Sequence, residues 1–274
     1  MRTQVEKANA FRALREREGA FVISNPWDVG TARLLARLGY EALATTSAGY
    51  AFSVGQRDNT VGRDQMLAHC AAIDSATDLP VSADLENGFA DDPKELAETI
   101  RCAADAGLVG GSIEDATGRA GDPIYTHAPP VERVHVAAEA ARSLPFRFTL
   151  TARSENYLDG RPDLADTVKR LQSYQEAGAD VLYAPGLKTK EEIAAVVRAV
   201  DRPVNVVMGL QGAELDRAEL SAIGAKRISV GSARSLSALG AFLRAARELR
   251  ETGTFAFAAD AVTYAESSAL LTNE

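Results

Sequence analysis

Four acidic side chains and one arginine are the residues whose types and spacing could do chemistry together. Asp84 and Glu86 alternate at the end of the apolar run 81–85, Glu114 and Arg153 end two later runs, and Asp58 lies in a segment rich in glycine and polar residues. Ionised carboxylates that share a pocket repel one another, by about 4 kcal/mol per pair at 4 Å and an effective dielectric near 20. Unless some are protonated, such a pocket therefore needs a cation.

The chemistry of these groups indicates which cation it would be. Hard oxygen ligands without histidine or cysteine favour Mg²⁺, with Mn²⁺ as an alternative, over zinc. Magnesium retains several waters, so we expect one direct carboxylate and others that act through water. A plainer interpretation stays open: acids at strand-to-helix junctions also cap helices or form ion pairs, and Arg153 could pair with Glu155 or Glu114.

Other polar residues point to an anionic ligand. The planar fork of Arg153 can hold a carboxylate through two hydrogen bonds. Ser47, Ala48 and Gly49 follow an apolar run, where they could form a backbone nest for an anion or an ordinary turn. Asn205, early in the run 204–208, could donate to a substrate oxygen or satisfy a core carbonyl.

The histidines and large aromatic residues carry weaker signals. His69 and His135 lie in helix-patterned stretches and are expected at the surface or in packing. His127 would reach the site only if its loop closed over it. Trp27 and Tyr50 are expected to pack, although both could line the mouth of the site.

The elements that must position these groups follow from hydrophobic patterning. Eight short aliphatic and β-branched runs recur at 21–26, 42–47, 81–85, 111–115, 148–153, 181–184, 204–208 and 227–231. A helix-patterned stretch follows almost every run. This alternation predicts an α/β fold, a parallel (β/α)₈ TIM-type barrel of one domain over 1–274, with function at the carboxyl ends of its strands.

Three segments depart from simple alternation. The stretch 48–60 is expected to be a long rim loop, and 117–130 (TGRAGDPIYTHAPP) a movable flap without helix or strand. Two amphipathic helices are predicted after the last strand, the second within a C-terminal extension at 255–274. A barrel needs only one helix there, so the second must cover the barrel bottom or pack on another subunit.

Bulk properties exclude some functions. The net charge of −8 argues against a nucleic-acid partner, because phosphate binding needs a basic surface. The charged N-terminal stretch has no apolar core, so we expect neither a signal peptide nor membrane attachment, and a cytoplasmic location. Cys70 and Cys102 form no metal motif and are expected to be reduced, with a disulfide as the alternative.

The order of several motifs resembles the isocitrate lyase/phosphoenolpyruvate mutase superfamily. The motifs are NPWD, ALATTSAG, QRDNT, VSADLENG, GSIEDA, LTARSENYL and VNVVMG, spread over 25–209. The resemblance implies Mg²⁺ held directly by Asp84, with Asp58, Glu86 and Glu114 acting mostly through water. Superfamily members commonly have two aspartates in the third strand, and Glu86 stands for the second.

The resemblance also implies a substrate site and an assembly. Arg153 and the backbone amides near Ser47, Ala48 and Gly49 would bind the carboxylate of a 2-oxo acid, with Asn205 as a further contact. Arg153, Asp58 and Glu114 are thus the expected catalytic residues. The last helices would be exchanged between neighbouring subunits of a homo-oligomer, usually a tetramer built as a dimer of dimers.

Departures from the superfamily pattern narrow the expected reaction. The flap lacks the Lys-(Lys/Arg)-Cys-Gly-His motif of the tricarboxylate lyases, and Pro185 stands where those lyases have a glutamate. The flap also lacks the asparagine of phosphoenolpyruvate mutase, and Arg119, Tyr125 or His127 would cover the substrate instead. The sequence therefore looks closer to the broad branch of the superfamily that lies beside the oxaloacetate decarboxylases and small-acid lyases.

We expect a Mg²⁺-dependent lyase that cleaves a C–C bond of a small 2-oxo or 2-hydroxy carboxylic acid through a pyruvate-enolate-like intermediate. Two alternatives stay open. One is cleavage or rearrangement of a P–C bond in a phosphonopyruvate-type compound. The other is a weakly catalytic protein that binds a 2-oxo acid.

Overall fold

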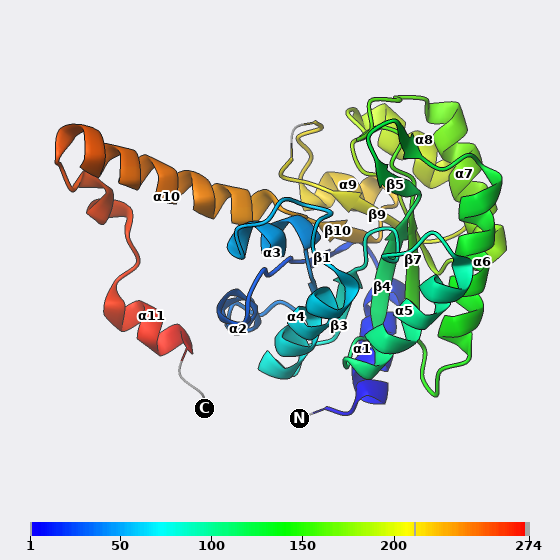
Figure 1. The fold of residues 1–274 in the computed structure, drawn as a ribbon, viewed down its shortest axis with the longest axis horizontal. Helices are drawn as coiled ribbons and strands as arrows, with labels where there is room; N and C mark the ends of the chain where they lie inside the picture. The colour runs from blue at the N-terminus through cyan, green and yellow to red at the C-terminus, as the bar shows by residue number, and fades with distance from the viewer. Residues whose placement is uncertain (1, 211, 272–274) are drawn as a thin grey trace.

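A closed parallel sheet forms the centre of the molecule in the computed structural model, which describes residues 2–210 and 212–271. Its strands are β1 (Phe21–Ile23), β2 (Leu43–Ala44), β3 (Val81–Asp84), β4 (Gly110–Glu114), β7 (Thr149–Arg153), β8 (Val181–Tyr183), β9 (Val204–Val207) and β10 (Arg227–Ser229). Their order is β1-β10-β9-β8-β7-β4-β3-β2 (Figure 1). A parallel bridge between Ser24 and Leu43 joins the two edges, so the sheet closes into a barrel.

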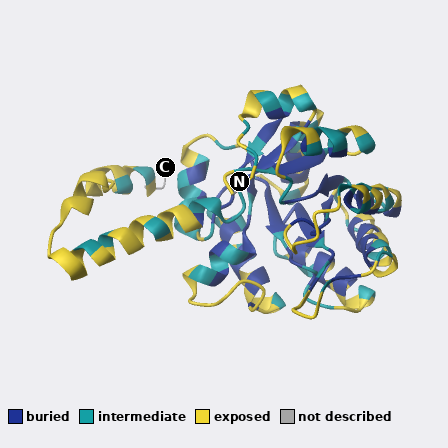
Figure 2. Cartoon of the chain, turned by 90° about the horizontal axis from the view of Figure 1, so that it is seen from above, coloured by how far each residue is buried: buried dark blue, intermediate teal, exposed yellow. Residues whose placement is uncertain are grey.

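The prediction of eight parallel strands and a barrel-type α/β fold is confirmed. Each predicted run overlaps one strand; seven strands are shorter than their runs, and β4 has the same length as its run but begins one residue earlier. The strand residues are almost all buried, and helices cover the outside of the barrel (Figure 2). Strands buried on both faces need the continuous aliphatic runs that the sequence shows.

Helices cover the outside of the barrel. They are α1 (Gln4–Glu16), α2 (Val29–Arg37), α3 (Ser47–Ser53), α4 (Arg63–Ala76), α5 (Pro93–Asp105), α6 (Ala128–Arg142), α7 (Leu164–Ala177), α8 (Lys190–Ala199), α9 (Arg217–Ile223), α10 (Ala233–Thr252) and α11 (Tyr264–Leu271), with a 3₁₀ helix, η1 (Ala256–Asp260). Asp28 caps α2 as predicted, because its side chain accepts from Thr31 N at 2.6 Å. None of the described helices has the length and apolarity to cross a membrane.

Two segments expected to lack regular structure contain it. The first part of the expected rim loop is helix α3, which begins where the Thr46 hydroxyl accepts from Gly49 N at 3.2 Å. The flap contains an antiparallel hairpin of β5 (Ala116–Arg119) and β6 (Asp122–Ile124). Both elements are too short to give a periodic signal in the sequence.

The C-terminal extension differs from prediction in one respect. Its second helix is divided into η1 and α11, because the chain is extended at Ala261 (ψ 139°). Helix α10 projects away from the barrel, and α11 returns toward α2 (Figure 1). Most of α10 is exposed, including Phe242 at 68% (Figure 2).

His69 and Tyr50 form a packed pair, as predicted. Their rings are stacked with centroids 3.7 Å apart, and His69 is buried in α4. His135 lies at the surface of α6, 3.5 Å from Glu139. Burial lowers the pKa of His69 to about 4 and outweighs the opposite effect of Asp28. His69 is therefore neutral in the folded protein near neutral pH.

This lowered pKa predicts a pH-dependent stability. Since the unfolded chain binds the His69 proton more tightly, the stabilisation is complete above about pH 6.5 and declines as pH falls toward about 4. We expect His69→Phe to remove about 2 kcal/mol of the loss in unfolding free energy between about pH 7.5 and pH 5. Urea unfolding at both pH values measures it, with His135→Gln as the matched surface control. Equal losses in His69→Phe and the wild type would contradict the prediction.

Candidate active site

Three neighbouring strands bring Asp84, Glu114 and Arg153 together at their carboxyl ends. Arg153 Nη1 lies 3.0 Å from Asp84 Oδ1 and 3.0 Å from Glu114 Oε2, while its Nε lies 2.8 Å from Glu155 Oε1. Glu114 and Arg153 are register partners on β4 and β7. One largely buried guanidinium therefore joins three carboxylates, two from separate strands and one from the loop that follows β7.

This cluster borders a cavity of about 290 Å³ inside the mouth of the barrel. Its lining includes most of the residues predicted for the site: Ser47, Ala48, Asp58, Asp84, Glu114, Arg153 and Asn205. A second, larger pocket of about 770 Å³ opens between 59–65, 86–95 and the base of the flap hairpin. Glu114 borders both hollows, so they meet at the acidic cluster.

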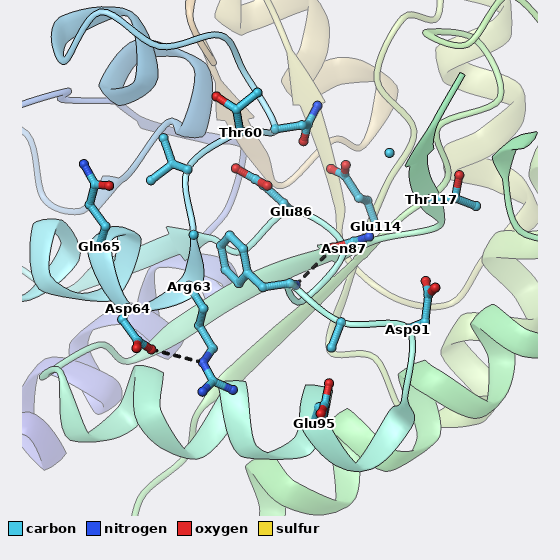
Figure 3. Close-up of a pocket in the computed structure, with 16 residues that line it drawn as sticks. Thr60, Arg63, Asp64, Gln65, Glu86, Asn87, Asp91, Glu95, Glu114 and Thr117 are labelled. Atoms are coloured by element: carbon cyan, nitrogen blue, oxygen red, sulfur yellow. Dashed lines mark hydrogen bonds and ion pairs between the residues drawn. The ribbon is translucent and has the colours of Figure 1, made fainter. Parts of the chain in front are cut away.

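Glu86 is placed differently from its prediction as the next inward residue of the third strand. Strand β3 ends at Asp84, and the backbone turns so that Glu86 has φ of +49°. The side chain borders the larger pocket beside Glu114 (Figure 3). Glu86 is 6% exposed, and its Oε1 has no hydrogen-bond partner among the described residues. Desolvation, then the charges of Asp84 and Asp58, raise its pKa to about 8.

The residues predicted to form an anion nest or an ordinary turn form the first turn of helix α3. Ser47, in the first turn of α3, donates to Asp84 Oδ2 from its N–H at 3.3 Å and from its Oγ at 3.1 Å. Ala48 lines the smaller cavity, but Gly49 does not. The Gly49 N–H already donates to Thr46, and a Cβ at this position would lie 2.6 Å from Thr46 Cγ2.

Asp58 lies on the exposed segment that follows α3 and reaches the cavity from above the strand ends. Desolvation and the nearby charge of Asp84 raise the pKa of its carboxyl. Burial likewise raises the pKa of Glu114, although Arg153 opposes this effect. The acids therefore lie close enough to influence one another, and Arg153 alone does not fully compensate them.

These residues can be tested for their fit to a divalent cation. Among residues 2–210 and 212–271, no three His, Cys, Asp or Glu side chains are arranged to hold a metal directly. Magnesium, however, takes one or two carboxylates and keeps water in its remaining positions. The unpartnered Oε1 of Glu86 and the all-oxygen acidic set fit such a hydrated ion, and no histidine or cysteine is found in the described linings.

The flap hairpin is held against the loop that follows β3. Arg119 Nη1 lies 3.0 Å from Asp91 Oδ2, and the Tyr125 hydroxyl also donates to Asp91. His127 Nε2 lies 3.2 Å from Ser173 Oγ. None of the three predicted covering residues lines either described hollow in this conformation; Ala116, Thr117 and Gly118 border the hollows instead.

Tyr183 and Arg227 are among the cavity-lining residues that sequence reasoning missed. Tyr183 is the register partner of both Arg153 and Asn205, and its ring lies 5.1 Å from Arg153 Cζ. Arg227 is the register partner of Asn205 on the next strand. A sequence signal for these two residues was present. Register partners on neighbouring strands share a face, so the inward-facing pattern at Arg153 could have been extended to the next strands. Glu155 is predicted from the sequence only as an alternative ion-pair partner of Arg153, not as a residue of the site.

Comparison with known proteins places this geometry in a family. The profile described as phosphoenolpyruvate phosphomutase matches residues 11–250. The chain therefore belongs to this family, within the isocitrate lyase/phosphoenolpyruvate mutase superfamily that its motifs resemble. Its relatives carry the names of lyases, decarboxylases and mutases, which supports an enzyme.

Three similar proteins illustrate the relationship. A solved structure from Burkholderia cenocepacia J2315, provisionally described as a lyase/mutase, is 63% identical, with a TM-score of 0.96 over 98% of this chain and 97% of that one. A 2,3-dimethylmalate lyase structure is 25% identical, with a TM-score of 0.85 over 99% and 94%. The 2-methylisocitrate lyase of Escherichia coli K12 is 28% identical over 71% of this chain and 67% of its own.

Proposed function

We propose that this protein is a Mg²⁺-dependent lyase that cleaves a C–C bond of a small 2-oxo or 2-hydroxy carboxylic acid and releases a pyruvate-type product. The observation that carries the proposal is the Arg153 guanidinium, bound to Asp84, Glu114 and Glu155 beside a small cavity. A divalent cation would offset the net negative charge of this cluster and would allow a carboxylate ligand to bind beside Arg153.

The acids have distinct roles in this proposal. Asp84 would hold Mg²⁺ directly, while Asp58, Glu86 and Glu114 would hold its water ligands. When bound, the ion would supply Lewis-acid stabilisation of negative charge on a substrate oxygen. Asp58, exposed at the rim of the cavity, is placed to exchange a proton between substrate and solvent.

Arg153 and the end of α3 would bind the substrate carboxylate. The three ion pairs of Arg153 use Nη1 and Nε, so Nη2 lies outside these contacts. Because the guanidinium is fixed before substrate arrives, it needs no reorganisation as negative charge develops, an effect worth about 3 kcal/mol for one well-placed donor. Ser47 and Ala48 line the same cavity, and Asn205 lines it from strand β9.

Two features favour C–C cleavage. Two of the three similar proteins named above are lyases, at 25% and 28% identity. The flap segment 117–130 contains no asparagine, cysteine or lysine, so it lacks the flap groups associated with the mutase and with the tricarboxylate lyases. A small acid without a third carboxylate is therefore the proposed substrate.

A panel assay tests the proposal. Oxaloacetate, 2,3-dimethylmalate, 2-methylisocitrate and phosphonopyruvate would each be incubated with Mg²⁺ or with EDTA. Released 2-oxo acid would be measured by coupled reduction, and phosphate by a colorimetric assay. We expect EDTA-sensitive C–C cleavage of at least one small acid. Phosphate release without C–C cleavage would establish the P–C alternative, and Mg²⁺-dependent binding without turnover would establish a binding protein.

We also propose that the projecting C-terminal helices pack on a second copy of the chain in a homo-oligomer. Helix α10 is long and amphipathic, yet few of its residues contact the barrel. Phe242, Leu243 and Phe255 are exposed on this extension at 68%, 47% and 65%. Apolar side chains in such number favour burial against another subunit.

A further inference from the structure

A buried arginine at the inner end of the small cavity has no counter-charge among residues 2–210 and 212–271. Arg227 begins β10 and is 4% exposed. Its Nε donates to Asn205 Oδ1 at 2.8 Å, but its Nη1 has no hydrogen-bond partner and no ion pair is found for it among the described residues. The charge that acts on it most strongly, from Arg15, is also positive; the Tyr183 hydroxyl opposes this effect, and the positive charge of Arg153 adds to it.

Such an arrangement is unusual because a charge removed from water is normally paired. An uncompensated buried ion costs several kcal/mol or more. Desolvation, with repulsion from Arg15, lowers the pKa of Arg227 to about 9, which still leaves it charged near neutral pH. Arg153, in contrast, has three carboxylate partners in the same barrel. The difference indicates that the partner of Arg227 comes from outside the chain.

The hydrogen bonds of Asn205 show what kind of partner fits. A guanidinium can only donate, so the amide oxygen of Asn205 must face Arg227 and its nitrogen must face away. Asn205 Nδ2 then donates to Ser229 Oγ at 3.0 Å. This leaves one amide hydrogen of Asn205 and the Nη1 hydrogens of Arg227 as donors without a described acceptor. Such a group of donors suits an anionic oxygen ligand.

Strand register connects this group with the candidate catalytic cluster. Arg153, Tyr183, Asn205 and Arg227 are successive register partners across β7, β8, β9 and β10. All four line the same cavity of about 290 Å³. A ligand that enters this cavity is therefore exposed to two arginines, one balanced by carboxylates and one not.

We propose that Arg227, together with the Asn205 amide, forms a second anion-binding element that takes a small carboxylate inside the barrel. The inference rests on the proposed function in one respect: if the protein is a lyase of a small acid, the bound carboxylate is a second acid group of the substrate. The same chemistry would also suit a free small anion. Aspartate at position 205 would supply the missing charge permanently, so a neutral asparagine keeps the element available to a ligand.

Anion binding by the metal-free protein tests the element without turnover. Sodium formate and sodium oxalate would be titrated at constant ionic strength, with melting temperature and calorimetry as readouts. We expect saturable stabilisation of the wild type and at least about tenfold weaker binding in Arg227→Met. Arg17→Gln is the matched control, since it removes the same charge from an exposed arginine paired with Glu41 and should bind like the wild type.

A second variant gives an independent readout. Asn205→Asp should raise the melting temperature in anion-free buffer, because it pairs the buried guanidinium, and should abolish the response to anions. If Arg227→Met weakens the binding of oxalate but not of formate, the ligand of this element is a diacid. If it weakens the binding of both, the ligand is a free small anion. Anion binding by Arg227→Met that equals wild-type binding overturns the proposal. If Arg227→Met does not fold, a melting temperature of Asn205→Asp below that of the wild type overturns it instead. A failed panel assay with a positive titration would sink the lyase proposal alone.

Discussion

Asp84→Ala is expected to abolish Mg²⁺-dependent ligand binding and to lower turnover at least about a hundredfold, the loss typical for one preorganised charged group. Asp84 is the proposed direct ligand, and its two oxygens also contact Arg153 and Ser47. Its removal therefore eliminates a metal ligand and frees two donors at once. Calorimetric titration of oxalate with and without Mg²⁺ measures the effect.

One further variant, with a matched control, separates charge from shape at this position. Asp84→Asn keeps an oxygen that can accept from Ser47 but carries no charge, so it should fail to bind Mg²⁺ while remaining folded. Asp105→Asn, which changes an exposed acid at the end of α5 that lines neither hollow, is the matched control and should bind like the wild type. Undiminished Mg²⁺-dependent affinity in Asp84→Ala would refute its assignment as the metal ligand.

Arg153→Met is expected to affect both substrate binding and stability. Loss of its fork should weaken carboxylate binding by about 2 kcal/mol or more, which raises KM at least about thirtyfold. It also leaves Asp84, Glu114 and Glu155 close together without their shared cation. Breaking a buried ion pair from one side typically costs about 3–5 kcal/mol of unfolding free energy, so urea unfolding should show a clear loss.

Arg153→Lys separates these two effects. A lysine retains the charge that holds the carboxylates together, but it cannot form the planar two-bond contact. We expect it to recover most of the stability while KM remains raised. Arg101→Met, which removes an exposed arginine of α5 paired with Glu98, should leave KM and stability nearly unchanged and serves as the control. A wild-type KM in Arg153→Met would remove this residue from the substrate site.

Local patterns were sufficient to predict the framework. Aliphatic runs separated by amphipathic stretches defined eight strands in order, and Asp28 marked a helix start that the structure confirms. Since parallel strands place their carboxyl ends at one rim, Asp84, Glu114 and Arg153 could be expected together before any contact was known. These inferences depend on repeats of two and 3.6 residues, which a single sequence contains.

Contacts between side chains of different elements could not be predicted from these repeats. Helix α3 and the flap hairpin are short, and the turn that gives Glu86 a positive φ ends the alternation two residues early. The Gly49 amide, expected to face a ligand, donates to Thr46 instead. The difference at Gly49 arises from helix capping, where a local hydrogen bond outweighs the average pattern.

The sequence by itself determined the order of strands and helices, the acids at strand ends and the family, because each is encoded within a few consecutive residues or in the order of short motifs. Tertiary structure alone decided which side chains meet: Arg153 with Asp84, Glu114 and Glu155, and Arg227 with a neutral amide. The stagger between neighbouring strands sets these partners, and it follows from the closing of the whole barrel.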